Sequence, residues 1–311
     1  MNFPLFIING FLDAGKSSFI DDTIKNDGFS EQGGTTLLLV CEEGEVEFDD
    51  KELSKYKVNI ARFDGVEEFT VSKLNELTSK YQPDRIILEA NTMWDKEKMR
   101  FPQTFKVNQV ISFIDFTTFP IYYNNMRQKF VDDLRFSNLV IINRCEDPKE
   151  LVPYQTSLKL INQDAQYFVM NSEGEANEAF EEPLPYDIDA PIIKIENDYF
   201  ARWYIDTFDN PDRYEGKKVE FIGRIEKSRK LPKDTFFVGR DAMTCCAADM
   251  QYYAHLCTSQ LGLKLKNRQW VHLVCEMKYV YSKEYDEDEL NLIPISIEVI
   301  PPLEDPILDL T

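Results

Sequence analysis

The sequence is poor in histidine and in positive charge. Only two histidines, His255 and His272, occur in 311 residues, and both lie in the C-terminal half. A Ser-His-Asp or Cys-His nucleophilic site is therefore not expected around Ser17 or Cys41. The chain carries 35 lysines and arginines against 55 aspartates and glutamates, a net charge of -20. No basic patch offsets this charge, so we expect neither nucleic-acid binding nor attraction to an anionic membrane surface.

Long apolar runs are also missing, and cysteine is sparse. The first apolar run ends at Gly10 and has no basic residue before it, so it predicts neither a signal peptide nor a membrane-spanning helix. Six cysteines in a chain of this length do not make a disulfide framework. We therefore expect a cytoplasmic protein that inserts no segment into a membrane and whose cysteines stay reduced.

The first half of the chain alternates apolar runs with amphipathic stretches. Runs that are apolar on both faces, separated by helical patterns such as VEEFTVSKLNELTSKY, are typical of a parallel sheet covered by helices. This predicts a doubly wound, mostly parallel α/β domain over residues 1–172. The expected strands are residues 4–9, 35–40, 57–63, 85–90, 109–115, 138–143 and 165–170.

Composition and rhythm change after residue 172. Residues 173–191 are acidic, contain prolines and show no periodicity, which predicts a linker. From residue 217 onward, apolar and polar residues alternate with period two in about five runs separated by short polar turns. This pattern predicts a small antiparallel β-barrel over residues 192–311, for which the five-stranded OB type is one candidate.

The stretch GFLDAGKSS fits the phosphate-loop pattern G-x-x-x-x-G-K-[ST] completely. An apolar run precedes it and a helical pattern follows, as in P-loop NTPases. The glycines let backbone N–H groups converge on an anion at a helix N-terminus. We expect Lys16 to reach the β- and γ-phosphates of a nucleotide and Ser17 to ligate Mg²⁺. The expected phosphate-binding residues are Gly10, Asp13, Ala14, Gly15, Lys16, Ser17 and Ser18.

A second motif concerns the identity of the base. Asn143, Arg144 and Glu146 follow the sixth apolar run, where guanine-binding P-loop proteins carry N-K-x-D. In that motif the carboxylate accepts the two N–H donors of guanine. Glu146 extends one methylene further than Asp, and Asp147 is the alternative carboxylate. The pattern favours GTP and GDP over adenine nucleotides, while an ordinary loop after a strand remains the other interpretation.

Several stretches together resemble the CobW-like GTPases, a P-loop class that includes metallochaperones. GFLDAGKSS is similar to the family's G-F-L-G-A-G-K-[ST]-[ST], and CEEGEVEFD to its switch region N-E-F-G-E-[VI]-G-x-D. IILEANT resembles the Walker B strand and its E-[TS]-[ST]-G ending, with Thr92 at the glycine, and DDLRFSNLVIINRCED resembles the stretch that leads into N-K-T-D. The similarity covers residues 3–170. It implies a Mg²⁺-dependent GTPase with catalytic residues Lys16, Glu42, Glu45 and Glu89 and with Ser17, Asp49 and Glu89 near the metal.

The chain departs from this family pattern in two places. The C-x-C-C metal motif is absent, since the corresponding stretch reads NIARFDGVEEFT. This removes the thiolates of the family's usual route for metal transfer. Thr92 replaces the glycine whose N–H meets the γ-phosphate in the family, which implies slow or altered hydrolysis.

The C-terminal part, residues 192–304, resembles the soluble domain of the YcgQ-type proteins, which accompany a bacterial membrane permease. The similar stretches are FDNPDRYEGKKVEFIGRI, FVGRDAMTCCAAD and WVHLVCEM. This resemblance implies an association with transport or metal homeostasis. It makes a permease or a metalloprotein client the expected partner.

Thiol and imidazole groups gather in the second half, at Cys245, Cys246, His255 and Cys257. These are ligand types that Zn²⁺ prefers. On a regular strand Cys245 and Cys246 point to opposite faces, whereas His255 and Cys257 share one. Buried cysteines also serve as small apolar fillers. The residues leave a Zn²⁺ or redox site and structural packing both open.

These features lead to three functional hypotheses. The first is a GTPase that acts as a nucleotide-gated metal-handling or transport-accessory factor. The second is a nucleotide-bound module that does not hydrolyse GTP and whose barrel docks a protein partner, which Thr92 and the missing C-x-C-C motif favour. The third, an ATP-dependent small-molecule kinase, is weaker because no lid or acceptor site is visible. The oligomeric state does not follow from the sequence.

Overall fold

The computed structural model describes residues 2–26, 29, 33–44, 46–176, 183–243, 250–282 and 287–309. The chain forms two compact units. The first comprises Met1–Leu151 and Asp164–Phe180, and the second comprises Val152–Gln163 and Glu181–Thr311. Residues 152–163, which precede the last strand of the first unit, therefore belong to the second unit.

The first unit is built on a seven-stranded sheet with the order β3-β2-β4-β1-β5-β6-β7. Every neighbouring pair of strands is parallel. The strands are β1 (Phe3–Gly10), β2 (Thr36–Val40), β3 (Val58–Arg62), β4 (Arg85–Glu89), β5 (Phe105–Asp115), β6 (Leu139–Asn143) and β7 (Gln166–Val169). All the strands predicted for this half are present, and the parallel sheet of a P-loop NTPase is confirmed.

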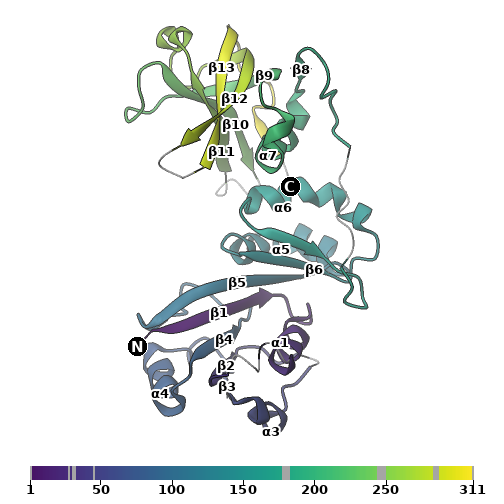
Figure 1. The fold of residues 1–311 in the computed structure, drawn as a ribbon, viewed down its shortest axis with the longest axis vertical. Coiled ribbons are helices and arrows are strands. Elements are labelled where there is room, and N and C mark those ends of the chain that lie inside the picture. Colours follow the sequence, from purple (N-terminus) through teal and green to yellow (C-terminus); the bar gives the residue numbers. More distant parts are fainter. Residues whose placement is uncertain are drawn as a thin grey trace. The chain divides into compact units, whose positions relative to one another are not determined.

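Helices cover both faces of this sheet (Figure 1). Strand residues point alternately to the two faces, so Leu38 packs with Ile24 of α1 while its neighbour Leu37 packs with Leu74 of α4. Thr70 caps α4, because its Oγ1 accepts a hydrogen bond from the N–H of Lys73. The helices of this unit are α1 (Lys16–Lys25), α3 (Asp50–Leu53), α4 (Val71–Tyr81) and α5 (Phe119–Leu134), with the 3-10 helices η1 (Ser54–Tyr56) and η2 (Pro148–Leu151).

The second unit contains a mixed sheet with the order β14-β10-β11-β13-β12-β9-β8 and an additional pairing of β10 with β9. The pairings β9–β10, β10–β11, β11–β13, β13–β12 and β12–β9 thus return to the strand from which they start. The strands are β8 (Ile193–Lys194), β9 (Lys218–Glu226), β10 (Thr235–Met243), β11 (Met250–Thr258), β12 (Trp270–Ser282), β13 (Glu287–Ile300) and β14 (Ile307–Asp309).

The prediction of a purely antiparallel sheet in this unit is wrong. β11 and β13 are parallel, as are β8–β9 and β10–β14. β13 is antiparallel to its hairpin partner β12, and its other edge lies against β11. Period-two alternation reports which side chains are buried but not the direction of the neighbouring strand, which is why the sequence did not reveal the mixed pairing.

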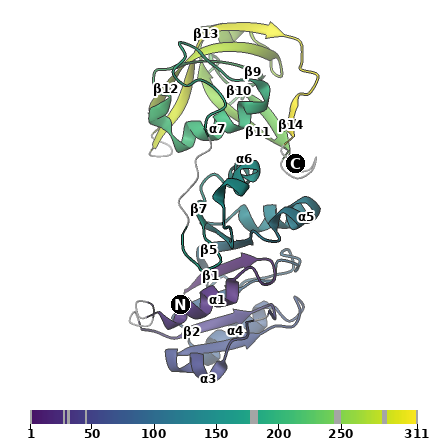
Figure 2. The same ribbon diagram turned by 90° about the vertical axis from the view of Figure 1, so that its right-hand side faces the viewer.

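A helix formed by the aromatic run YFARWY packs on this sheet. α7 (Phe200–Asp209) lies beside β11 (Figure 2). The ring of Trp203 lies 4.8 Å from that of Phe221 on β9 and 5.1 Å from that of His255 on β11. The aromatic run therefore holds α7 against the sheet. The other helices of the unit are α6 (Val152–Ile161), η3 (Asn197–Tyr199), η4 (Pro211–Arg213) and η6 (Gln260–Lys264).

Candidate functional site

The phosphate loop joins the end of β1 to the start of α1. Gly10 and Gly15 have φ values of 137° and 107°, which side chains rarely adopt. A Cβ atom on Gly10 would lie 2.5 Å from the carbonyl oxygen of Phe113, and one on Gly15 would lie 2.7 Å from Nδ2 of Asn143. Asp13, the departure from the family pattern, has a φ of 60°. The shape of the loop thus requires both glycines of the phosphate-loop pattern.

The ammonium group of Lys16 is folded back onto its own loop. It donates hydrogen bonds to the carbonyl oxygens of Gly10 at 2.7 Å and Phe11 at 2.8 Å, and pairs with Oε2 of Glu42 at 2.5 Å. The Lys16 side chain is 3% exposed. A phosphate group entering the loop would therefore compete with Glu42 for this cation.

Ser17 and Glu89 meet at the first turn of α1. The Ser17 hydroxyl donates a hydrogen bond of 2.6 Å to Oε1 of Glu89, which is the last residue of β4. Glu89 is 2% exposed, and its Oε2 accepts no hydrogen bond from the described residues. Burial raises the pKa of the Glu89 carboxyl, while Ser17 and Lys16 act in the opposite direction. A buried carboxylate oxygen without a donor, beside a hydroxyl, suits a small divalent cation with oxygen ligands.

The phosphate loop lines a cavity of about 50 Å³ together with part of the predicted switch region. Asp49 does not line it, because its side chain caps α3 by accepting hydrogen bonds from the N–H groups of Lys51 and Glu52. Glu45 lies outside the described residues. The lining residues are Leu12, Asp13, Gly15, Lys16, Ser17, Ser18, Glu42, Gly44, Val46, Glu89 and Arg144.

The end of β6 is fastened to the phosphate loop. Nδ2 of Asn143 donates to the carbonyl oxygen of Ala14 at 3.2 Å. The guanidinium group of Arg144 donates to the carbonyl oxygen of Asp13 at 2.9 Å and pairs with the Asp115 carboxylate at the end of β5. Two residues of the base motif therefore hold the loop in place.

Glu146 is held by a residue that the sequence motifs did not single out. Its Oε1 accepts hydrogen bonds from the Ser172 hydroxyl and, at 2.9 Å, from the Ser172 N–H. These bonds lower the pKa of the Glu146 carboxyl. Asp147, the alternative carboxylate, accepts a hydrogen bond from the N–H of Lys149 near the start of η2. Both Asp115 and Ser172 could have been found from the sequence. Asp115 ends one predicted parallel strand and Ser172 closely follows another, and the carboxyl ends of parallel strands lie at the same edge of a sheet.

His255 and Cys257 lie in the core of the second unit. His255 is 3% exposed and packs against the rings of Trp203 and Tyr204, and burial lowers its pKa to about 3. Cys257 is also buried. Cys245 and Cys246 lie outside the described residues. In the part of the chain that the structure describes, no three His, Cys, Asp or Glu side chains are grouped so that they could hold a metal ion.

Two protein families match successive parts of the chain. Residues 4–172 match the CobW/HypB/UreG nucleotide-binding domain, and residues 170–306 match the DUF1980 C-terminal domain. The UPF0703 protein YcgQ of Bacillus subtilis (strain 168) is 24% identical over 103 residues, which are 33% of this chain and 35% of that protein. The chain therefore spans about a third of the length of this curated relative.

Similar solved structures include the hydrogenase maturation factor HypB from Archaeoglobus fulgidus and the Zn(II)-bound YjiA GTPase from E. coli. HypB is 16% identical with a TM-score of 0.39, over 56% of this chain and 84% of HypB. YjiA is 13% identical with a TM-score of 0.43, over 77% of this chain and 86% of YjiA. At these scores the likenesses add nothing to the fold derived above. Among the described helices, none has the length and apolar character needed to cross a membrane.

The nucleotide-binding family covers more than half of the 311 residues. Its matched range contains the phosphate loop, the Ser17–Glu89 pair and the Asn143–Glu146 motif. These are the elements that the geometry brings to one edge of the parallel sheet. The chain therefore belongs to the CobW/HypB/UreG family through its nucleotide-binding domain.

Proposed function

We propose that the chain binds GTP and hydrolyses it with the help of Mg²⁺, as a nucleotide-gated metal-handling or transport-accessory factor. The observation that carries this proposal is the pairing of Ser17 with the buried Glu89, beside a complete phosphate loop. One oxygen of the Glu89 carboxylate accepts no hydrogen bond from the described residues. Membership of the CobW/HypB/UreG family supports the nucleotide-binding part. The metal-handling role rests on the family resemblance, and the transport role rests on the partial likeness to YcgQ.

The residues at the loop fit a Mg²⁺ ion. Ser17 and Glu89 offer hydroxyl and carboxylate oxygens, the ligands that this ion prefers. When bound, Mg²⁺ would supply positive charge that offsets the negative charge of the phosphate groups. The Ser17 hydroxyl and the Glu89 carboxylate would hold the ion.

In the proposed reaction a water molecule attacks the γ-phosphorus, and the bond from that phosphorus to the β–γ bridging oxygen breaks. The products are GDP and inorganic phosphate. Lys16 leaves its loop carbonyls and Glu42 to neutralise the charge on the phosphoryl oxygens, together with the loop N–H groups. Catalysis of this kind depends on positioned charge rather than on a nucleophilic side chain.

Phosphate release under single-turnover conditions tests the hydrolysis. We expect Glu89→Gln to slow it at least about a hundredfold, because one preorganised charged group commonly contributes about that much. Glu43→Gln is the control that makes the same chemical change, since Glu43 is exposed and does not line the cavity. Equal rates in Glu89→Gln and the natural sequence would contradict the role given to Glu89.

Base selection is proposed for Glu146, positioned by its two hydrogen bonds from Ser172. A carboxylate held in this way accepts from the adjacent N1–H and N2–H donors of guanine, whereas adenine offers no such adjacent pair of donors. We expect Glu146→Ala to reduce the preference for GTP over ATP at least about tenfold, the effect of losing a charged hydrogen bond. Glu173→Ala is the control, because Glu173 is exposed and its backbone N–H, not its carboxylate, makes the local bond to Asn171.

A second candidate function is a nucleotide-bound module that turns over negligibly. Thr92 favours it, because this residue is 1% exposed and stands where the CobW-like GTPases carry glycine.

For either function we infer that the second unit is an OB-type barrel, supported by its ring of five strand pairings. A permease or metalloprotein client and a cytoplasmic location complete the proposal. Zn²⁺ binding by Cys245, Cys246, His255 and Cys257 stays a prediction.

A further inference from the structure

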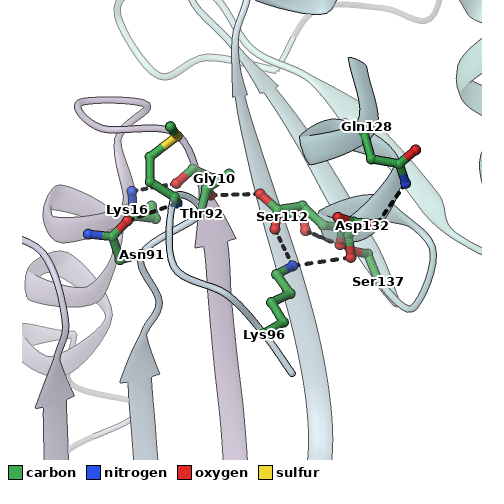
Figure 3. A network of polar contacts seen from close by, with 11 residues as sticks. Gly10, Lys16, Asn91, Thr92, Lys96, Ser112, Gln128, Asp132 and Ser137 are labelled. Atoms are coloured by element: carbon green, nitrogen blue, oxygen red, sulfur yellow. Dashed lines mark hydrogen bonds and ion pairs between the residues drawn. The ribbon is translucent and has the colours of Figure 1, made fainter. Parts of the chain in front are cut away.

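A polar cluster joins the segment after β4 to the end of α5 (Figure 3). The Thr92 hydroxyl donates a hydrogen bond of 2.7 Å to Oδ2 of Asp133. The Lys96 ammonium pairs with Oδ1 of the same carboxylate and donates to the carbonyl oxygen of Asp132 at 3.1 Å. We call Thr92, Lys96 and Asp133 the Asp133 clasp. It holds the segment at two points, on either side of Trp94.

The anchor of this clasp is fixed to the sheet. The carbonyl oxygen of Asp133 accepts hydrogen bonds from the hydroxyls of Ser112 at 3.0 Å and Ser137 at 2.8 Å. Ser112 lies on β5, and its strand partner is Asn9 on β1, next to the first residue of the phosphate loop. Asp133 therefore has a set position beside the phosphate-binding edge, and the part of the clasp that can move is the segment carrying Thr92 and Lys96.

The segment continues the strand that carries Glu89, but the clasp lies on the other face of the sheet. Because side chains alternate along a strand, Glu89 lines the phosphate-loop cavity while Leu88 and Ala90 line a separate hollow of about 650 Å³. Thr92 also lines this hollow and does not line the phosphate-loop cavity. Glu89 and Thr92 thus lie three residues apart on one segment, at cavities on opposite faces of the sheet.

We propose that the Asp133 clasp restrains the segment after β4, and so limits the rate at which the site reaches its hydrolysing arrangement. The proposal rests on the GTPase function proposed above and names a regulation of that site. GTPase segments near the γ-phosphate commonly change between a free and an ordered arrangement. Here the segment is held by the contacts of the clasp, and in this proposal they must be broken before Glu89 is repositioned.

The clasp holds the segment more firmly than a surface ion pair would, because its carboxylate is buried. The Asp133 side chain is 5% exposed and Lys96 supplies the cation that pairs with it. A buried carboxylate that loses its cation is strongly destabilised. The Lys96 side chain is 37% exposed, so it is the part of the clasp that a substitution or a bound molecule can reach without opening the core.

Two substitutions loosen the clasp in different ways. Thr92→Val removes the hydroxyl and keeps the buried shape, and Lys96→Gln removes the exposed charge. Their matched controls are Thr78→Val, which alters another buried threonine, and Lys98→Gln, which alters a lysine of the same segment that pairs only weakly with Asp95. None of the four residues lines the phosphate-loop cavity.

The test measures three quantities in each variant: GTP affinity, single-turnover phosphate release, and the fluorescence of Trp94 with a non-hydrolysable GTP analogue. We expect Thr92→Val and Lys96→Gln to speed phosphate release by about tenfold with little change in GTP affinity, as for the loss of one charged hydrogen bond. The fluorescence change of Trp94 is identified by its loss in Trp94→Phe. This change should occur faster in both clasp variants than in the natural sequence. The two control variants should behave as the natural sequence does.

The outcomes separate this inference from the function on which it depends. Normal GTP binding with unchanged or slower phosphate release in both clasp variants would overturn the restraint and leave the GTPase proposal standing. A Trp94 signal that does not respond to the GTP analogue would overturn it as well, since the segment would then not move. Absence of GTP binding in the natural sequence would overturn both proposals together.

Discussion

Gly10 shows at the residue scale how strictly the phosphate loop constrains its sequence. Its φ is 137°, and a Cβ atom would lie 2.5 Å from the backbone oxygen of Phe113, which cannot move without disturbing β5. We expect Gly10→Ala to lower the free energy of unfolding of the first unit by roughly 1–3 kcal/mol. Gly174→Ala is the control, because Gly174 also has a positive φ of 81° but has only an ordinary contact with Met170. Denaturant unfolding measures the loss of unfolding free energy in both variants. Gly174→Ala reports the backbone strain alone, and Gly10→Ala reports the strain and the steric clash together. Equal losses of free energy would contradict the clash.

The Lys16–Glu42 pair gives a second prediction at this scale. The two groups are 2.5 Å apart, with side chains 3% and 10% exposed, so Glu42 competes directly with a phosphate for the ammonium. We expect Glu42→Gln to tighten GTP binding about threefold to tenfold, corresponding to about 1 kcal/mol of lost competition. Equilibrium titration measures the change. Weaker binding in Glu42→Gln would mean that Glu42 helps to hold the nucleotide or its metal instead.

At the scale of elements, α7 depends on one buried carboxylate. Asp206 is 3% exposed and accepts hydrogen bonds from Arg213 at 2.8 and 2.9 Å, from Asn210 at 2.9 Å and from the Tyr214 hydroxyl. We expect Asp206→Asn to lower the free energy of unfolding of the second unit by roughly 2 kcal/mol or more. Asp209→Asn, in the last position of the same helix, should cost less than about 0.5 kcal/mol because its pair with Lys159 is exposed. Thermal unfolding of the two variants provides the comparison, and equal losses would rule out the special role of Asp206.

The elements also mark the limit of what the sequence could predict. The strands of the first unit were predictable because each contains a short apolar run, most clearly β2, where all five residues are buried. The phosphate loop was predictable because its residues are contiguous. The pairing of Asp133 with Thr92 was not predictable, because it is a tertiary contact between segments distant in the sequence. The two-residue strand β8 is too short for any periodicity to indicate it.

At the scale of the whole molecule, the two units have separate cores. The buried cluster that contains Trp203 and Phe221 consists of residues of the second unit, and the clusters around Leu37 and Leu38 consist of residues of the first. We expect two unfolding transitions in scanning calorimetry. GTP should raise the midpoint temperature of only one of them, the transition of the first unit. At a concentration a hundred times the dissociation constant, a ligand stabilises its unit by about 2.7 kcal/mol. A single transition, or an equal shift of both, would contradict this independence.

The central claim is that GFLDAGKSS binds a guanine nucleotide, and a calorimetric titration tests it most directly. The nucleotide-free protein is titrated with Mg²⁺-GTP and with Mg²⁺-ATP, and the Lys16→Ala variant is titrated in the same way. The account predicts saturable binding of GTP, much weaker binding of ATP, and loss of GTP binding in Lys16→Ala. Absence of binding by either nucleotide, or GTP binding that is unchanged in Lys16→Ala, would contradict it.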